Sequence, residues 1–111
     1  RYEIVFSPEA HDDLKRLSAR DRTTACSAIE THLRFEPGKT SKSRIKRLRG
    51  MSRPEYRLRV GELRIYYDIK DTDVEVLAII PKSQASNWLD DMVKQHENNA
   101  LSEIKDQLSK F

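Results

Sequence analysis

The sequence predicts an α+β fold in which an antiparallel β-sheet carries an N-terminal helical hairpin on one face, followed by a C-terminal helical extension. Three observations lead to this prediction. Apolar residues alternate in several short segments, as in half-buried strands. They recur every three or four residues in others, as in amphipathic helices. The 111 residues, 37% of them hydrophobic, suffice for one modest core. We expect a domain over residues 1–89 and the extension over residues 90–111.

The N-terminal third reads as one strand and two helices. Alternation over residues 2–6 predicts the strand. Ser7-Pro8-Glu9 predicts a helix start, because serine caps free N–H groups, proline is tolerated at the first helical position and an acid suits the positive end of the helix dipole. A polar break at 18–21 precedes the second helix. The apolar residues of the two helices are Ala10, Leu14, Leu17, Ala25, Ile29 and Leu33.

The middle of the chain predicts a three-stranded meander. Residues 36–43 contain Pro37-Gly38 and form a connector from helix to strand. Strands over 56–60, 63–69 and 74–80 are separated by a short turn at Gly61-Glu62 and a polar turn at 70–73. The last strand is the most apolar and is expected to lie centrally, and Pro81 ends it.

The C-terminal region returns to helical spacing. A helix is expected from Ser83, with an interruption at Asn98-Asn99 and a last short helix over 101–108. We interpret residues 90–111 as a docking or oligomerising helix. The alternative is that this segment, whose net charge is negative, folds over the basic surface of the preceding domain and masks it.

Positive charge is concentrated in one segment. The net charge is +3, yet Lys39 to Arg64 holds ten Lys and Arg against two Glu, a local charge of +8. Such a block predicts a polyanionic partner, RNA or DNA first. The block reads as strand rather than amphipathic helix, so a membrane surface is not favoured. No apolar run approaches the ~20 residues of a membrane span, and we expect a cytoplasmic protein.

Strand alternation places several of these cations together. If Tyr56, Leu58 and Val60 face the helices, the side chains of Arg57 and Arg59 emerge on the opposite side. Arg64 and Tyr66 of the next strand share that side. We call this surface the arginine face and expect it to be open. One interpretation is a solvated surface; the other is phosphate binding, with the Tyr66 ring stacking on a base or donating to phosphate.

Other chemistry is not favoured. The single cysteine, Cys26, lies in a helix and is expected to be a half-buried structural thiol. His11, His32 and His96 are too scattered for zinc, so we expect no metal and no cofactor. The acidic pairs at 12–13 and 90–91 are expected to be solvated surface, and no phosphate-binding glycine loop occurs.

Three linked segments, Leu48-Arg49-Gly50-Met51, Tyr56 to Gly61 and Leu63 to Tyr67, resemble the RelE/ParE superfamily of bacterial toxins. The order of elements over residues 2–82 is similar as well. The resemblance implies a RelE-like fold and a toxin of a type II toxin–antitoxin pair. The RelE-like branch cuts mRNA in the ribosomal A site, whereas the ParE-like branch poisons DNA gyrase.

The resemblance also implies site residues. Arg57 matches a family lysine nearest the general-base role, Arg59 matches a lysine that stabilises phosphate, and Arg64 matches a phosphate-binding arginine. Lys82 stands at the position of a family arginine. Trp88 falls near a family tyrosine; it either stacks on a base or, as we favour, anchors the last helix. The further RNA-binding candidates are Lys46, Arg47, Arg49 and Tyr66.

Two arginines in place of lysines weaken the case for catalysis, because a guanidinium is a poor base. The favoured function is nonetheless a ribosome-dependent mRNA endonuclease that inhibits translation. The expected partners are ribosome, mRNA and a cognate antitoxin in a hetero-oligomeric complex. The alternatives are a gyrase inhibitor, or a catalytically weak homologue that acts mainly by binding its antitoxin.

Overall fold

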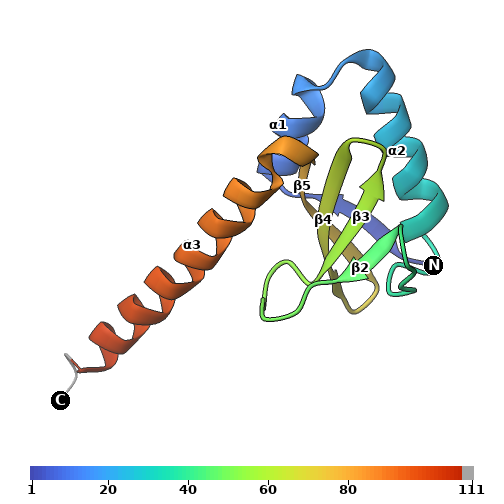
Figure 1. Cartoon of the computed structure of the whole chain (residues 1–111). Coiled ribbons are helices and arrows are strands. Elements are labelled where there is room, and N and C mark those ends of the chain that lie inside the picture. Colours follow the sequence, from blue (N-terminus) through green and yellow to red (C-terminus); the bar gives the residue numbers. More distant parts are fainter. Residues whose placement is uncertain (109–111) are drawn as a thin grey trace.

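The computed structural model describes residues 1–108 of the chain, and it confirms the predicted α+β class (Figure 1). Five strands form one sheet in the order β1-β5-β4-β3-β2, accompanied by three helices. The elements in chain order are β1 Glu3–Phe6, α1 Pro8–Arg16, α2 Ala19–Leu33, β2 Ile45–Arg47, β3 Tyr56–Val60, β4 Leu63–Lys70, β5 Asp73–Pro81 and α3 Lys82–Leu108.

The sheet is mixed rather than wholly antiparallel. Strands β2, β3, β4 and β5 pair antiparallel, which confirms the meander, but β1 pairs parallel with β5. The helical hairpin and strands β2, β3 and β4 separate these two strands in sequence. A parallel partner needs such a long crossover, which alternation within one strand does not reveal. The short edge strand β2 is a further element that the sequence did not predict.

Serine caps begin both N-terminal helices, as expected at Ser7. The Ser7 hydroxyl accepts from the Ala10 N–H at 3.0 Å, and Pro8 occupies the first turn. The Ser18 hydroxyl accepts from the Asp21 N–H at 3.1 Å and starts α2. Each cap satisfies a backbone donor that the first helical turn leaves unpaired. Local sequence therefore fixes where both helices start.

The main core lies between the helical hairpin and one face of the sheet. Alternate residues of β3, β4 and β5 meet the apolar residues of α1 and α2, and the predicted helix faces are confirmed. The Tyr67 hydroxyl donates to the Pro37 carbonyl at 2.6 Å and so ties the connector to this core. The fully buried members include Leu33, Leu58, Ile65, Tyr67, Val74 and Val76.

The opposite face is partly covered by the start of α3, which corrects the expectation of an open arginine face. A second apolar cluster forms there around Tyr66, Ala78 and Ile80. The residues of α3 and of the segment after β2 that pack on it are Leu48, Ala85, Trp88 and Leu89.

Helix α3 is continuous from Lys82 to Leu108, so the predicted break at Asn98-Asn99 is wrong. Asparagine is only a weak helix breaker, and a helix tolerates it at modest cost. Only the first turns of α3 lie on the sheet, and the remainder extends away from it (Figure 1).

Candidate nucleic-acid interface

The strand register brings four of the predicted cations into two adjacent rows on the arginine face. In one row Lys46 pairs with Arg57, which pairs with Tyr66. In the other Arg59 pairs with Arg64. Residues directly opposite one another in a sheet project on the same side at about 5 Å. The predicted cluster of Arg57, Arg59 and Arg64 is therefore a feature of the fold, and Lys46 joins it.

Arg64 lies at the base of this cluster and is not exposed as expected. Its side chain is buried, and its Nη1 atom donates to the carbonyls of Gly61 at 2.8 Å and Leu63 at 2.9 Å. Burial lowers the pKa of the Arg64 guanidinium, and the nearby charges of Arg57 and Arg59 lower it further. The two carbonyls hold the guanidinium in one orientation beneath its neighbours.

Arg57 is half-buried beside Tyr66, and part of its hydrogen-bonding capacity is unused. Its Nε atom is inaccessible and has no hydrogen-bond partner among the described residues. Arg59 is exposed. A buried donor without a partner costs free energy, so this position of Arg57 is unfavourable for the folded state.

Tyr66 and Trp88 form a stacked pair on this face. Their ring centroids lie 4.9 Å apart and the planes make an angle of 20°. Tyr66 is only 2% exposed, so the expectation that its ring emerges on an open surface is wrong. Burial raises the pKa of the Tyr66 hydroxyl, although Arg57 and Arg64 act in the opposite direction. Trp88 packs on the sheet in the way that the favoured interpretation, an anchor for the last helix, requires.

The other predicted residues lie at the margins of the arginine face. Lys82 begins α3, and its N–H donates to the Glu62 carbonyl at 2.7 Å, which puts it at the sheet end that carries Arg59. Arg47 pairs with Tyr56 and so projects to the opposite side from Lys46. Arg49 is exposed in the segment after β2.

A hollow of about 1110 Å³ lies along the edge strand β2. It is bounded by the connector around Gly38 and by the segment 48–52. Lys46, Arg47 and Arg49 contribute to its lining. The hollow adjoins the arginine face through Lys46, because Lys46 lies directly opposite Arg57.

Most of the cations in this region have no acidic partner. Ten cations lie between Lys39 and Arg64, and two of them form ion pairs within the described part of the chain. Lys39 pairs with Glu36, and Arg53 pairs with Asp68 and Glu75. The cations that make no ion pair with a described residue are Lys42, Arg44, Lys46, Arg47, Arg49, Arg57, Arg59 and Arg64. Unpaired like charges repel one another, so the region carries an uncompensated positive potential that attracts anions.

Two carboxylates that the sequence did not single out as important are structural. Asp13, expected to be solvated, accepts from the Ile79 N–H at 3.0 Å, at an edge of β5 that β1 does not cover. Asp68 is buried and accepts from the Glu55 N–H at 2.7 Å. An acid within a strand of buried apolar residues is the signal that could have identified Asp68, since charged side chains are rarely buried unless paired.

Among the side chains that the structure describes, no group of three or more His, Cys, Asp or Glu is arranged to hold a metal ion. No described helix is both long and apolar enough to cross a bilayer. Cys26 is a free, half-buried thiol on α2, as expected.

Comparison with known proteins identifies the family. The sequence model described as the ParE toxin of the type II toxin–antitoxin system parDE matches residues 4–86. No curated protein matches the chain. Among solved structures, the RelBE2 toxin–antitoxin complex of Mycobacterium tuberculosis is similar, with 28% identity, 72% of this chain and 96% of that chain covered, and a TM-score of 0.58.

Two archaeal structures have the same fold. They are the RelB–RelE complex of Methanococcus jannaschii (19% identity, 76% and 96% covered, TM-score 0.58) and the RelE–RelB complex of Pyrococcus horikoshii OT3 (22% identity, 72% and 93% covered, TM-score 0.59). The family match spans most of the chain and includes the strands that carry the arginine face. The chain therefore belongs to the family of ParE toxins of type II toxin–antitoxin systems, within the RelE/ParE superfamily.

Proposed function

We propose that this toxin is a ribosome-dependent mRNA endonuclease and that the arginine face binds the scissile phosphate. The observation that carries the proposal is the cluster of Arg57, Arg59 and Arg64 on two adjacent strands, with no acidic partner among the described residues. Guanidinium groups bind phosphate in fixed, paired geometry. Lys46 extends the positive surface toward the hollow at β2.

The proposed reaction is transfer of the phosphate within the RNA. The 2′-oxygen forms a bond to phosphorus, the bond from phosphorus to the 5′-oxygen breaks, the 2′-hydroxyl loses its proton and the 5′-oxygen gains one. Negative charge grows on the phosphate oxygens during this step. Fixed cations stabilise that charge, and loss of one such group commonly costs about 10²–10³ in rate.

We assign roles within this reaction from position. Arg64, held by the carbonyls of Gly61 and Leu63, and the exposed Arg59 stabilise the phosphate. Arg57, half-buried on β3 beside Tyr66, lies nearest the 2′-hydroxyl and orients it. Lys82 supplies a further charge at the turn end of the sheet.

A cognate antitoxin is the proposed protein partner. The similar toxins of known structure were solved as complexes with RelB antitoxins. We propose that residues 1–89 form the toxin domain and that residues 90–111 are an extension through which the hetero-oligomeric complex assembles. The course of α3, which extends away from the sheet beyond its first turns, supports this assignment (Figure 1).

Primer extension on a defined mRNA in a purified translation system tests the endonuclease. Discrete cuts that need both the toxin and ribosomes are the expected result. The control is Arg20→Ala, which removes an exposed arginine of α2 without touching the arginine face. Intact message at high toxin concentration overturns the proposal.

Gyrase inhibition is the second candidate. The family description names ParE, and the arginine face consists of groups that stay protonated and so bind anions better than they accept protons. A DNA supercoiling assay with purified gyrase distinguishes the two functions. A toxin inactive in both assays that still binds its antitoxin would be the catalytically weak homologue.

A further inference from the structure

We propose that Arg53, Asp68 and Glu75 are positioning residues of the interface, which hold the loop 48–55 so that Arg49 meets a bound polynucleotide. The inference rests on the proposed function, because it assumes that the cations bind a single-stranded polyanion. It adds residues that touch no substrate in the proposed reaction. It also names the element through which they act, the segment between β2 and β3, which we call the β2–β3 loop.

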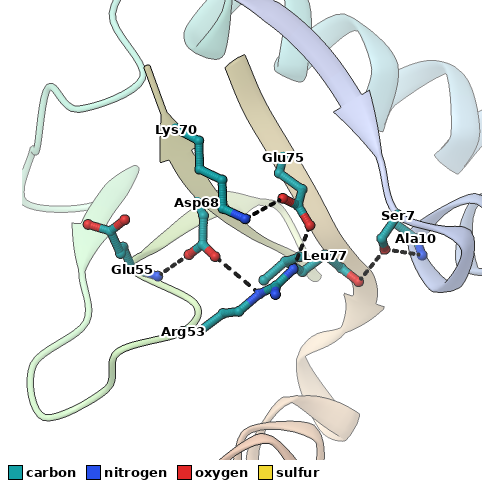
Figure 2. A network of polar contacts seen from close by, with 8 residues as sticks. All are labelled: Ser7, Ala10, Arg53, Glu55, Asp68, Lys70, Glu75 and Leu77. Atoms are coloured by element: carbon teal, nitrogen blue, oxygen red, sulfur yellow. Dashed lines mark hydrogen bonds and ion pairs between the residues drawn. The ribbon is translucent and has the colours of Figure 1, made fainter. Parts of the chain in front are cut away.

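The β2–β3 loop is closed at its base and anchored at its C-terminal side. The Leu48 N–H donates to the Glu55 carbonyl at 2.8 Å, which joins the two ends. Figure 2 shows the anchor, in which Arg53 reaches from the loop to the carboxylates of Asp68 on β4 and Glu75 on β5. The Arg53 Nε atom lies 3.3 Å from Asp68 Oδ2.

Asp68 holds the loop through two different atoms. Its Oδ1 accepts from the Glu55 N–H at 2.7 Å while its Oδ2 faces Arg53. The Asp68 side chain is 6% exposed, whereas that of Arg53 is 46% exposed, so the carboxylate is buried and the guanidinium covers it from the solvent side. Lys70 pairs with Glu75 at 3.3 Å, and two cations therefore balance two carboxylates. Hydrogen bonds to a buried, charged acceptor such as Asp68 are stronger than those between neutral groups.

The anchor at Arg53 fixes the position of the loop tip, residues 49–52. Only residues 49–52 separate the closed base from Arg53, and Gly50 makes the turn with φ of +75°. The tip forms one wall of the 1110 Å³ hollow, opposite the connector, and carries Arg49 into its lining. Without the anchor, a bound polynucleotide must order the tip, and this ordering lowers affinity.

The anchor also neutralises acidic groups on the arginine face. Asp68 lies two residues along β4 from Tyr66 and pairs with Glu75 across the sheet. Two free carboxylates at this place would attract the cations of the face and repel phosphate. Arg53 is thus the arginine of the basic segment that serves the structure of the site, whereas Arg49, Arg57 and Arg59 are left for a ligand.

Binding of a labelled single-stranded RNA of about 12 nucleotides, followed by fluorescence anisotropy, tests the proposal. The variants are Asp68→Asn, Arg53→Gln, Arg49→Ala and the double variant Asp68→Asn/Arg49→Ala. Asp68→Asn keeps an oxygen for the Glu55 N–H and removes the charge that faces Arg53. Arg53→Gln removes the same ion pair by changing its half-exposed partner, and it leaves the buried Asp68 unchanged. The matched control is Asp13→Asn, which alters a carboxylate that also accepts a backbone N–H but lies on α1.

We expect Asp68→Asn, Arg53→Gln and Arg49→Ala each to weaken RNA binding about tenfold, and Asp13→Asn to leave it within twofold. The double variant should bind no more than about twofold more weakly than Arg49→Ala, because the anchor acts through Arg49. Hydrogen exchange of the peptide 48–55 should rise in Asp68→Asn and Arg53→Gln and stay unchanged in Asp13→Asn.

The outcomes separate this inference from the proposed function. Additive effects of Asp68→Asn and Arg49→Ala would overturn the positioning role, as would unchanged RNA binding and exchange in both anchor variants. Wild-type protein that binds no RNA would overturn the proposed function, and the positioning role with it. Reduced binding in the anchor variants with coupling to Arg49 supports both.

Discussion

The indole of Trp88 lies flat on the phenol ring of Tyr66, joining the first turns of α3 to the middle of β4. Both rings belong to the second apolar cluster, with Ala78 and Ile80 beneath them. The chain has one tryptophan, so its fluorescence reports this contact alone. The contact explains why Tyr66 is inaccessible on a face that otherwise carries exposed cations.

Trp88→Ala should lower the free energy of unfolding by about 2 kcal/mol, less than for a fully buried tryptophan because Trp88 is half-buried. Urea unfolding followed by circular dichroism measures the change. Asn87→Ala, at an exposed neighbouring position of α3, serves as the control. Equal stability of the Trp88→Ala variant and the wild type would contradict the anchoring role.

Asp13 should make stability depend on pH. Burial raises the pKa of the Asp13 carboxyl above its ordinary value of 3.8, and this effect exceeds the opposing hydrogen bond from Ile79. The folded state then binds the proton more tightly than the unfolded chain, so the contribution of Asp13 falls as pH rises from 3.8 through the folded pKa. The stability difference between wild type and Asp13→Asn, measured by urea unfolding across this window, should decrease with pH.

Tyr67→Phe should destabilise the fold by about 1–2 kcal/mol, because it removes the only described donor to the buried Pro37 carbonyl. Thermal unfolding measures the loss. Tyr56→Phe is the matched control: its ring stacks on Tyr67 with centroids 5.5 Å apart, but its hydroxyl makes no hydrogen bond to another described residue. Equal losses in the two variants would show that the connector is not held by this bond.

Arg57→Ala and Arg64→Ala should relieve growth arrest when the toxin is expressed, and reduce mRNA cleavage about 10²-fold or more. Arg20→Ala should leave both unchanged. Expression levels are matched by immunoblot, and urea unfolding tests whether the Arg64 variant remains folded, since Arg64 is buried. Undiminished toxicity of both arginine variants would place the site elsewhere.

Arg57→Lys should increase cleavage. An ammonium flanked by other cations releases its proton more readily than a guanidinium does, so lysine is the better proton acceptor at this position. The expected result is a higher rate of ribosome-dependent cleavage with a pH profile that rises toward alkaline values. A lower rate at every pH would show that the residue at position 57 acts only by orienting the 2′-hydroxyl and that a proton acceptor there gives no advantage.

Local features of the fold could be predicted from sequence, because their causes are local. Ser7 caps α1 through a residue three positions away, and alternation set the faces of β3 and β4, so that Arg57 and Arg59 were placed correctly relative to Leu58. The turn at Gly61 could be predicted for the same reason, because glycine readily adopts the positive φ, here 56°, that a tight turn between strands requires.

Features that depend on distant contacts could not be predicted. Nothing within β1 indicates its parallel pairing with β5, and nothing within Ser83 to Trp88 indicates that this stretch covers Tyr66. The burial of Arg64 follows from that coverage and from two carbonyls at a turn. The partner of Asp68, Arg53, comes from a loop whose path the sequence does not specify.

The pairing of β1 with β5 affects when the toxin becomes active during its synthesis. Ser7 donates to the carbonyl of Leu77, 70 positions further along the chain, and β1 has no other strand beside it. The first strand is therefore made long before its partner, and pairing across so many residues is slow to form. A nascent chain that stops before β5 lacks the strand on which α1, β1 and β4 all pack. The toxin can therefore fold only after β5 has been synthesised, when most of the chain has been made. Truncated products stay unfolded, so chaperones can bind them and proteases can degrade them.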